Sequence, residues 1–188
     1  MYRRAFMKHA ALAAAAAALS SPLAATGAEG NEGGRLITVV SARADETGYV
    51  DAPDAGDLIR LGSDRLENFR LLAAAIAEHR GATFCGLVAP SDYALLQQAA
   101  MPARVSFVSE ITHMPTASGT HHTESTLSAT TMKKVFDHID ALSTDRYGMA
   151  VSAYHTVVGL KAAAVAKRHD FTTGHFAQNA FVSFVFKA

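Results

Sequence analysis

The sequence offers little for thiol chemistry. Its 188 residues include one cysteine and no tryptophan. A single cysteine cannot close an internal disulfide, so folding does not depend on an oxidising compartment. Cys85 lies inside the apolar segment from Thr83 to Val88. A thiol in such a segment is typical of a small buried core residue, whereas a catalytic thiolate needs an exposed, electropositive setting.

Neither sign of charge is in excess, because 17 Lys and Arg residues balance 17 Asp and Glu residues. A surface that binds nucleic acid normally carries an excess of basic side chains, so no nucleic-acid partner is expected. Acidic residues outnumber basic ones between Glu29 and Asp57, and the reverse holds after Met132. We interpret both regions as solvated surface; an acidic docking arm for a protein partner is the alternative.

Several short motifs of known enzyme classes are also missing. The sequence contains no Gly-x-Gly-x-x-Gly fingerprint, no phosphate-binding loop, no Gly-x-Ser-x-Gly elbow and no Cys-x-x-Cys-His haem site. The common forms of nucleotide binding, hydrolase chemistry and covalent haem attachment are therefore not expected.

The apolar run from Ala10 to Leu19 consists mostly of alanine. A membrane-spanning helix needs about 20 strongly apolar residues, so no permanent membrane anchor is expected. The run follows Arg3, Arg4 and Lys8, and small residues follow Pro22. A basic start, a short apolar middle and a zone of small residues are the three parts of a secretory signal.

Residues 1–28 resemble a twin-arginine export signal through the pattern Arg3-Arg4-x-Phe6-Met7-Lys8. The resemblance implies recognition by the twin-arginine export machinery, delivery to the periplasm, and cleavage after Ala28 or after Gly27. An ordinary secretory signal is the alternative. Proteins of this route cross the membrane already folded, often with a cofactor or partner acquired in the cytoplasm. The resemblance therefore favours a metal, a redox cofactor or membership of a complex.

The remaining residues indicate a flexible lead-in at 29–34 and one domain at 35–188. Apolar strand segments alternate with amphipathic helix segments in the order 36–41, 63–79, 83–88, 92–100 and 105–111. Such alternation with short links is typical of parallel crossover units. We therefore predict a single three-layer α/β domain with a mainly parallel sheet and helices on both faces.

The other segments give less regular signals. The stretch 44–57 is predicted to be a loop or an irregular hairpin, and the polar stretch 112–130 is predicted to be a long loop. Later segments are predicted as a helix, a short strand, a second helix and a closing strand that is apolar on both faces, at 132–142, 149–153, 154–168 and 181–186. The segment 147–167 also fits a helix.

Metal-ligating side chains crowd the second predicted loop, which contains His113, His121, His122 and Glu124. Glu110 lies just before them, at the end of the predicted strand. Ligands bind at the carboxyl ends of strands in open parallel sheets, and imidazole and carboxylate groups suit zinc, copper or iron. The sequence therefore predicts a site for a divalent transition metal.

Neighbouring side chains of an extended chain point in opposite directions, so His121 and His122 are not expected to share one metal. One of them is expected to join His113 and Glu124, or a distant histidine such as His155 or His175. The alternative is an exposed loop whose histidines titrate freely.

These patterns favour an exported periplasmic binding or accessory protein that carries a metal and works with a redox partner. One alternative is a small metal- or cofactor-dependent enzyme that uses Glu110 and the histidine-rich loop. Another is a passive envelope protein without a ligand. The sequence does not identify a substrate, a partner or an oligomeric state.

Overall fold

The computed structural model describes residues 35–51, 57–128, 131–138, 147–158, 162–174 and 178–188. The predicted signal segment 1–28 and lead-in 29–34 lie outside the described residues. The strands are β1 (Leu36–Ser41), β2 (Asp57–Leu61), β3 (Thr83–Val88), β4 (Ser106–Thr116), β5 (Gly119–Ser128), β6 (Ala162–Thr173) and β7 (Phe181–Lys187). The helices are α2 (Arg65–Glu78), α3 (Pro90–Ala100), α4 (Met132–His138) and α5 (Tyr147–Val158), with short 3-10 turns η1 (Ala42–Thr47), η2 (Tyr49–Asp51) and η3 (Met101–Ala103). No helix of the described ranges is long and apolar enough to cross a membrane.

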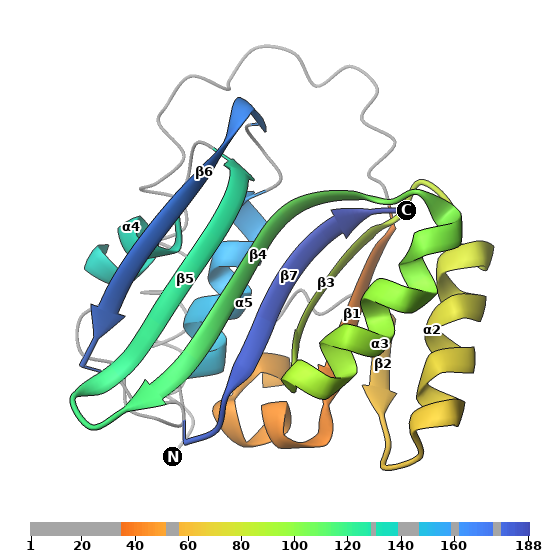
Figure 1. Ribbon diagram of the computed structural model, residues 1–188, viewed down its shortest axis with the longest axis horizontal. Helices are drawn as coiled ribbons and strands as arrows, with labels where there is room; N and C mark the ends of the chain where they lie inside the picture. The colour runs from red at the N-terminus through yellow and green to blue at the C-terminus, as the bar shows by residue number, and fades with distance from the viewer. Residues whose placement is uncertain (1–34, 52–56, 129–130, 139–146, 159–161, 175–177) are drawn as a thin grey trace, which may run out of the picture.

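All seven strands form one sheet in the order β2-β1-β3-β7-β4-β5-β6 (Figure 1). The prediction of a mainly parallel sheet is wrong, because only the β1–β2 and β1–β3 pairs are parallel and the other four pairs are antiparallel. The difference arises at β7, which inserts between β3 and β4 and runs against both. The short connections between consecutive strands and helices predicted parallel neighbours. They did not indicate that a strand from the end of the chain pairs between β3 and β4.

The first half of the chain forms the predicted strands and helices and one further strand, β2, that the sequence pattern did not predict. β1 and β3 lie side by side and parallel, with α2 between them in sequence. The N-cap of α2 is Asp64, whose carboxylate accepts hydrogen bonds from the backbone N–H groups of Leu66 and Glu67 at 2.9 and 3.1 Å. The predicted loop at 44–57 contains two 3-10 turns and ends at β2.

The predicted loop at 112–130 is instead a hairpin, since β4 continues to Thr116 and β5 runs from Gly119 to Ser128. Gly119 has a φ of 147°, which side-chain-bearing residues rarely adopt. A Cβ at this position would collide with the carbonyl oxygen of Thr173 in β6. The glycine therefore permits the close approach of the turn to the third strand of this antiparallel group.

The second half also reverses the predicted order of strand and helix. α5 covers Tyr147 to Val158, and the following segment 162–173 forms β6. The helical spacing of Tyr147, Val151, Tyr154 and Val158 prevails, because all four side chains are buried against the sheet. The alanine-rich start of β6 favours a helix locally, and its pairing with β5 overrides that preference.

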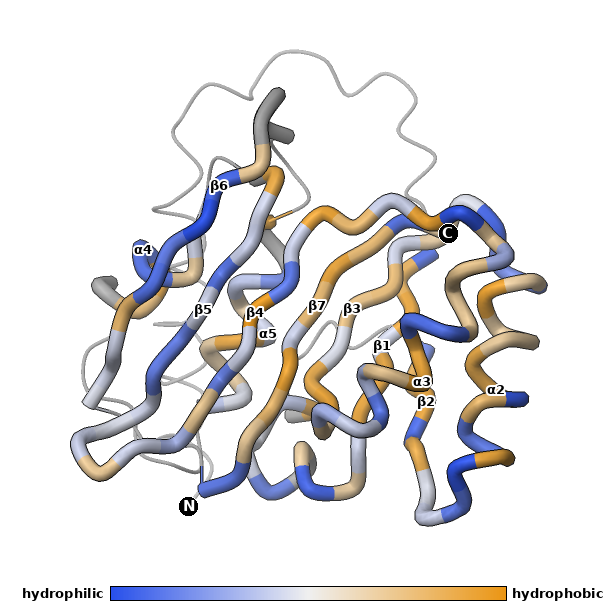
Figure 2. The backbone as a smooth tube through the Cα atoms, in the orientation of Figure 1, coloured by the Kyte–Doolittle hydropathy of each residue, from blue (hydrophilic) through white to orange (hydrophobic). Residues whose placement is uncertain are grey.

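Helices pack against both faces of the sheet, but they do not cover it evenly. α2 and α3 bury the apolar side chains of β1, β3 and β7 on one face. On the other face, η1, η2, α4 and α5 pack over β3, β7 and β4. Figure 2 shows hydrophobic β1, β3 and β7 beside the more hydrophilic β5 and β6. The face of β5 and β6 on the α3 side exposes Ser125, Arg168 and Asp170, so the helical layer there is incomplete.

Cys85 lies on β3 near the middle of the sheet and is buried, as predicted. Burial raises the pKa of its thiol. Its sulfur lies 3.8 Å from the hydroxyls of Thr38 and Tyr49, which are weak contacts within the core. The surroundings agree with the expected role as an unreactive core residue.

Candidate metal centre

The alternation of the β4–β5 hairpin divides the five predicted ligands between two faces of the sheet. His113 lies opposite His122 across the two strands, and Met114 lies opposite His121. His113, His122 and Glu124 are buried beneath α4 and α5, each with 0% exposure. His121 is on the opposite face, as the alternation rule for neighbouring residues predicted. Glu110 is also on that face.

The imidazoles of His113 and His122 meet directly. Their Nδ1 atoms lie 2.9 Å apart, and the two rings are nearly perpendicular, at 83°. The hydroxyl of Tyr147, in the first turn of α5, contacts the same Nδ1 atom of His113. Three polar atoms from two strands and one helix therefore converge inside the core.

The outer nitrogens of both rings have their own partners. Nε2 of His113 lies 2.8 Å from Oγ of Ser183 on β7, and Nε2 of His122 lies 3.0 Å from Oγ1 of Thr173 on β6. When Nε2 carries the ring proton, it donates to these hydroxyls and leaves Nδ1 with a lone pair. Hydrogen bonds of this kind fix the tautomer of metal-binding histidines.

Burial keeps this group electrically neutral in the absence of an ion. Desolvation lowers the pKa of His113 well below its usual range, with smaller contributions from His122 and His155. Desolvation, with a smaller effect of His121, lowers the pKa of His122 to about 3. Burial also raises the pKa of the Tyr147 hydroxyl. Neutral imidazole is the form that binds metals.

Glu124 has a different set of contacts. Its two carboxylate oxygens accept the backbone N–H of Met132 at 2.9 and 3.1 Å, and Oε1 accepts the Tyr154 hydroxyl at 2.7 Å. Burial raises the pKa of this carboxyl, against the opposing effects of those two hydrogen bonds and of His169. The carboxylate therefore ties the start of α4 to the sheet and to α5.

The other two predicted ligands, His121 and Glu110, have separate partners on the opposite face of the sheet. His121 lies 3.4 Å from Thr172 and 4.0 Å from the Asp170 carboxylate. Glu110 accepts a hydrogen bond from the Tyr93 hydroxyl at 2.6 Å. Neither side chain reaches the buried pair, because the sheet separates them.

Two further histidines have buried nitrogens without a hydrogen-bond partner among the described residues: Nε2 of His155 and Nε2 of His169. His155 contacts the Tyr49 hydroxyl at 2.6 Å through Nδ1, and His169 lies opposite Glu124 on β6. Both belong to the buried face, so they extend the polar cluster around His113 and His122. His175, the other distant histidine considered as a ligand, lies outside the described residues.

Sequence reasoning did not find Tyr147, Ser183 or Thr173, which complete the surroundings of the histidine pair. The sequence contained one indication of Tyr147, because this residue belongs to the apolar stripe that predicts the buried face of α5. Ser183 interrupts the apolar strand β7, and a hydroxyl at a buried position needs a polar partner.

Within the described ranges, no three or more His, Cys, Asp and Glu side chains are arranged to hold a metal ion. The cluster at His113 differs in that its third member is a tyrosine. The chain matches no family, no curated protein and no solved structure to which it was compared.

Proposed function

We propose that this chain is an exported binding or accessory protein that carries a transition-metal ion between His113, His122 and Tyr147. The observation that carries the proposal is the convergence of three donor atoms on one point in the core. Nδ1 of His113 has either one proton or one lone pair, so it makes one full hydrogen bond. It faces both His122 Nδ1 at 2.9 Å and the Tyr147 hydroxyl. A metal ion accepts all three lone pairs at once.

The distance between the imidazoles fits this role. Two nitrogens bound to the same zinc ion at ~2.0–2.1 Å lie about 3–3.5 Å apart, close to the 2.9 Å between the Nδ1 atoms. The contacts of both Nε2 atoms with Ser183 and Thr173 supply the outer partners that metal-binding histidines require. Tyr147 would lose its proton on binding, so uptake releases protons to the solvent.

Full burial favours loading before the fold closes. Both imidazoles have no exposed surface, so an ion enters a folded chain only after the structure opens. Residues 1–28 resemble a signal for an export route that carries folded proteins. Such a route suits a protein that binds its metal in the cytoplasm. We then expect a periplasmic redox partner that receives the metal ion or acts together with the metal-loaded protein.

The alternative of an enzyme that uses Glu110 with the histidines is less well supported. Glu110 and the pair His113–His122 lie on opposite faces of the sheet, so they do not contact a common substrate. A passive protein without ligand is the outcome that the following experiment distinguishes.

Metal uptake by the purified chain tests the proposal. The protein is refolded with Zn²⁺ or Cu²⁺, desalted, and analysed for bound metal by mass spectrometry. We expect one ion per chain, and we expect a His113→Asn, His122→Asn double variant to lose it. The control is His121→Asn, which changes the neighbouring residue on the opposite face and is expected to retain full uptake.

Tyr147→Phe provides a test that does not require the double variant to fold. With Cu²⁺ bound, the tyrosinate is expected to give a visible charge-transfer band, and this band is expected to disappear in Tyr147→Phe while the histidine pair still binds metal. Absence of metal from the folded wild type after refolding with either ion rules out the metal-binding function.

Export is tested separately from metal binding. Replacement of Arg3 and Arg4 by lysine is expected to leave the precursor in the cytoplasm, because paired guanidinium groups are the recognised feature of the family that residues 1–28 resemble. The measurement is immunoblotting of cytoplasmic and periplasmic fractions. Normal periplasmic accumulation of the variant indicates the ordinary secretory route instead.

A further inference from the structure

A pocket of about 180 Å³ lies where β4, β5 and β6 separate. It is lined by Phe107 to Glu110 of β4, Ser125 to Leu127 of β5 and Ala166 of β6. β4 has a bulge between Phe107 and Ser109, and the pairing of β5 with β6 shifts between Thr126 and Ser128. These two irregularities, in β4 and in the pairing of β5 with β6, separate the strands locally and so create the pocket.

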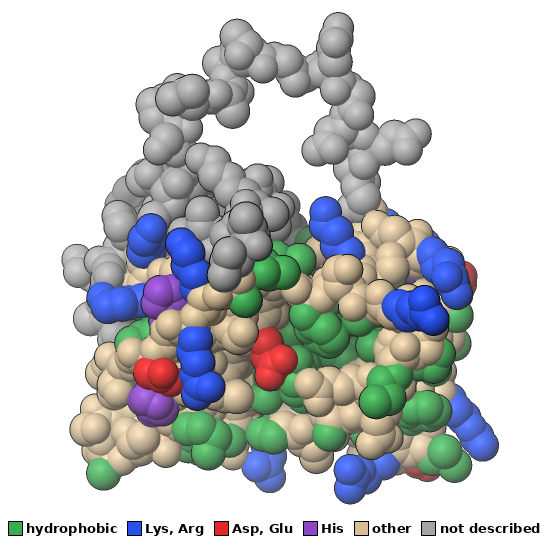
Figure 3. All heavy atoms as spheres, turned by 45° about the horizontal axis from the view of Figure 1, so that its top comes forward, with side chains coloured by type: hydrophobic (Ala, Val, Ile, Leu, Met, Phe, Trp, Pro, Cys, Tyr) green, Lys and Arg blue, Asp and Glu red, His purple; other side chains and the backbone are tan. Residues whose placement is uncertain are grey.

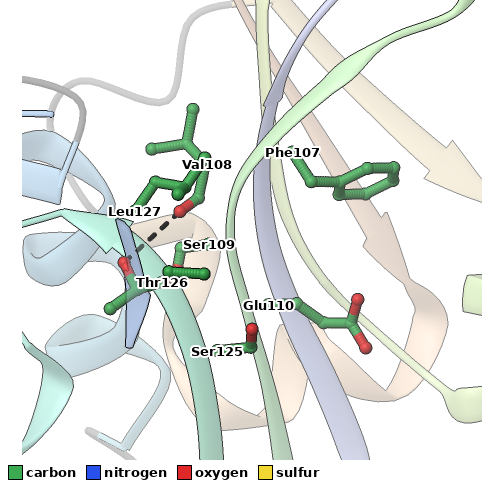
Figure 4. A pocket seen from close by; sticks show the side chains of 8 residues that line it. Phe107, Val108, Ser109, Glu110, Ser125, Thr126 and Leu127 are labelled. Carbon is green, nitrogen blue, oxygen red and sulfur yellow. Dashed lines mark hydrogen bonds between the residues drawn. The ribbon is translucent and has the colours of Figure 1, made fainter. Parts of the chain in front are cut away.

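The walls of the pocket combine apolar groups with one carboxylate. Figure 4 shows the side chains of Phe107 and Glu110 on the same side of β4, one beyond the other along the strand. Leu127 and Ala166 supply aliphatic surface, whereas the Val108 side chain packs against the core on the α5 side of the sheet. Thr126 donates a hydrogen bond to the Val108 carbonyl at 3.3 Å, and this contact ties the bulge to β5.

Tyr93 of α3 holds the aromatic and acidic walls in place. Its hydroxyl donates to Glu110 Oε2 at 2.6 Å, and its ring packs edge-on against Phe107 with centroids 6.5 Å apart. One buried side chain therefore orients both the Phe107 ring and the Glu110 carboxylate before any ligand binds. Such preorganisation reduces the entropic cost of binding.

The Glu110 carboxylate has no cationic partner within the described part of the chain, where the recorded ion pairs involve other acids, Asp57 and Asp170. Figure 3 shows the exposed face, where Lys, Arg and His side chains gather over β5 and β6 and hydrophobic side chains lie over the middle of the sheet. A half-buried carboxylate beside an aromatic ring is complementary to an organic cation with apolar substituents.

We propose that this pocket binds a small organic ammonium ion, with the cationic nitrogen between the Phe107 ring and the Glu110 carboxylate. The volume corresponds to about six water molecules, which suits a ligand of roughly seven non-hydrogen atoms. The apolar groups of the ligand contact Leu127 of β5 and Ala166 of β6. The site lies on the opposite face of the sheet from His113 and His122, so it does not depend on metal binding.

The probes are choline and its neutral isostere 3,3-dimethylbutan-1-ol, which have the same shape and differ in charge. Binding is followed by the amide shifts of the ¹⁵N-labelled chain. We expect choline to shift the amides of residues 107–110 and 125–127, and to bind at least about tenfold more tightly than the alcohol. Higher salt is expected to weaken choline binding, because one contact is ionic.

Two variants identify the pocket. Glu110→Gln is expected to remove the preference for choline over the alcohol, whereas Glu78→Gln, the same change on the exposed surface of α2, leaves it intact. Ala166→Phe is expected to block both ligands by filling the pocket from an exposed position on β6.

The comparison of the two probes uses the wild-type protein and does not depend on the folding of any variant. Equal affinity for choline and the alcohol overturns the proposal, as does the absence of shifts in residues 107–110 at about 50 mM choline, a concentration well above the millimolar range expected for so small a ligand. Shifts confined to other parts of the chain also overturn it.

Discussion

The free energy of unfolding of the metal-free protein is expected to fall by several kcal/mol when the pH is lowered from 7 to 5. Desolvation lowers the pKa of His155 and of His122 to about 3, and lowers that of His113 well below its usual range. In the unfolded chain these groups have the ordinary histidine pKa of about 6.5. All three therefore titrate in the unfolded state over this pH range and resist protonation in the folded state.

The sign follows from proton binding. Above about pH 6.5 the three imidazoles are neutral in both states, and their stabilising contribution is fully present. As the pH falls below 6.5, the unfolded chain takes up protons that the folded chain excludes. Each histidine that remains neutral in the folded protein then lowers the stability by about 2 kcal/mol between pH 7 and pH 5.

Glu124 acts in the opposite direction. Burial raises the pKa of its carboxyl in the folded state, so this group favours the folded state more strongly as the pH falls towards the pKa of the unfolded glutamate. The expected net loss is therefore smaller than the sum of the three histidine contributions. A Glu124→Gln variant lacks this compensation, and its stability is expected to depend more steeply on pH.

Urea unfolding curves at pH 7 and pH 5, recorded with EDTA, measure the effect. His155→Gln is expected to reduce the difference between the two curves by about 2 kcal/mol, because it removes one imidazole whose Nε2 is buried. His121→Gln, which changes the neighbouring imidazole on the opposite face of the sheet, serves as the matched substitution outside the buried group. Equal stability of the wild type at the two pH values contradicts the burial of the three side chains.

The second large effect is expected from Glu124→Ala, which should destabilise the protein by about 3–5 kcal/mol. The substitution removes the acceptor for the Met132 N–H and the Tyr154 hydroxyl. Both donors are buried, so they lose hydrogen bonds that water does not replace. The start of α4 also loses its attachment to β5.

Urea unfolding and amide hydrogen exchange measure this change. Exchange is expected to accelerate first in α4, because Glu124 holds Met132 directly. Ser125→Ala is the matched control: it changes the next residue, which is exposed on the opposite face, and is expected to cost less than about 0.5 kcal/mol. A similar cost for both variants contradicts the anchoring role.

Metal uptake by Glu124→Gln separates anchoring from ligation. The carbonyl oxygen of the amide retains two lone pairs, enough for the Met132 N–H and the Tyr154 hydroxyl, which both reach Oε1 of Glu124. The histidine pair and Tyr147 are unchanged. We therefore expect the variant to bind as much metal as the wild type. Loss of the metal from a folded Glu124→Gln protein indicates that the carboxylate is a ligand, in agreement with the prediction from the sequence.

The β4–β5 hairpin follows one local rule and departs from one expectation. The neighbouring residues His121 and His122 were expected to point apart, and they do, since alternation is a local property of any extended chain. Which of the two faces the core depends on pairing with β4 and on the position of α5. The burial of His113 and His122 was therefore not predictable from local spacing, and an exposed loop fitted the same residues.

Local pattern by itself determined β1, α2, β3, α3 and β7, together with the buried position of Cys85, because periodicity and apolar runs specify these elements without distant partners. Tertiary structure alone decided the insertion of β7 between β3 and β4, the extension of β5 and β6 as strands, and the meeting of Tyr147 with the two histidines. These features depend on hydrogen bonds and contacts between residues far apart in the chain. Their energy comes from pairing and burial, which a local stretch of sequence does not contain.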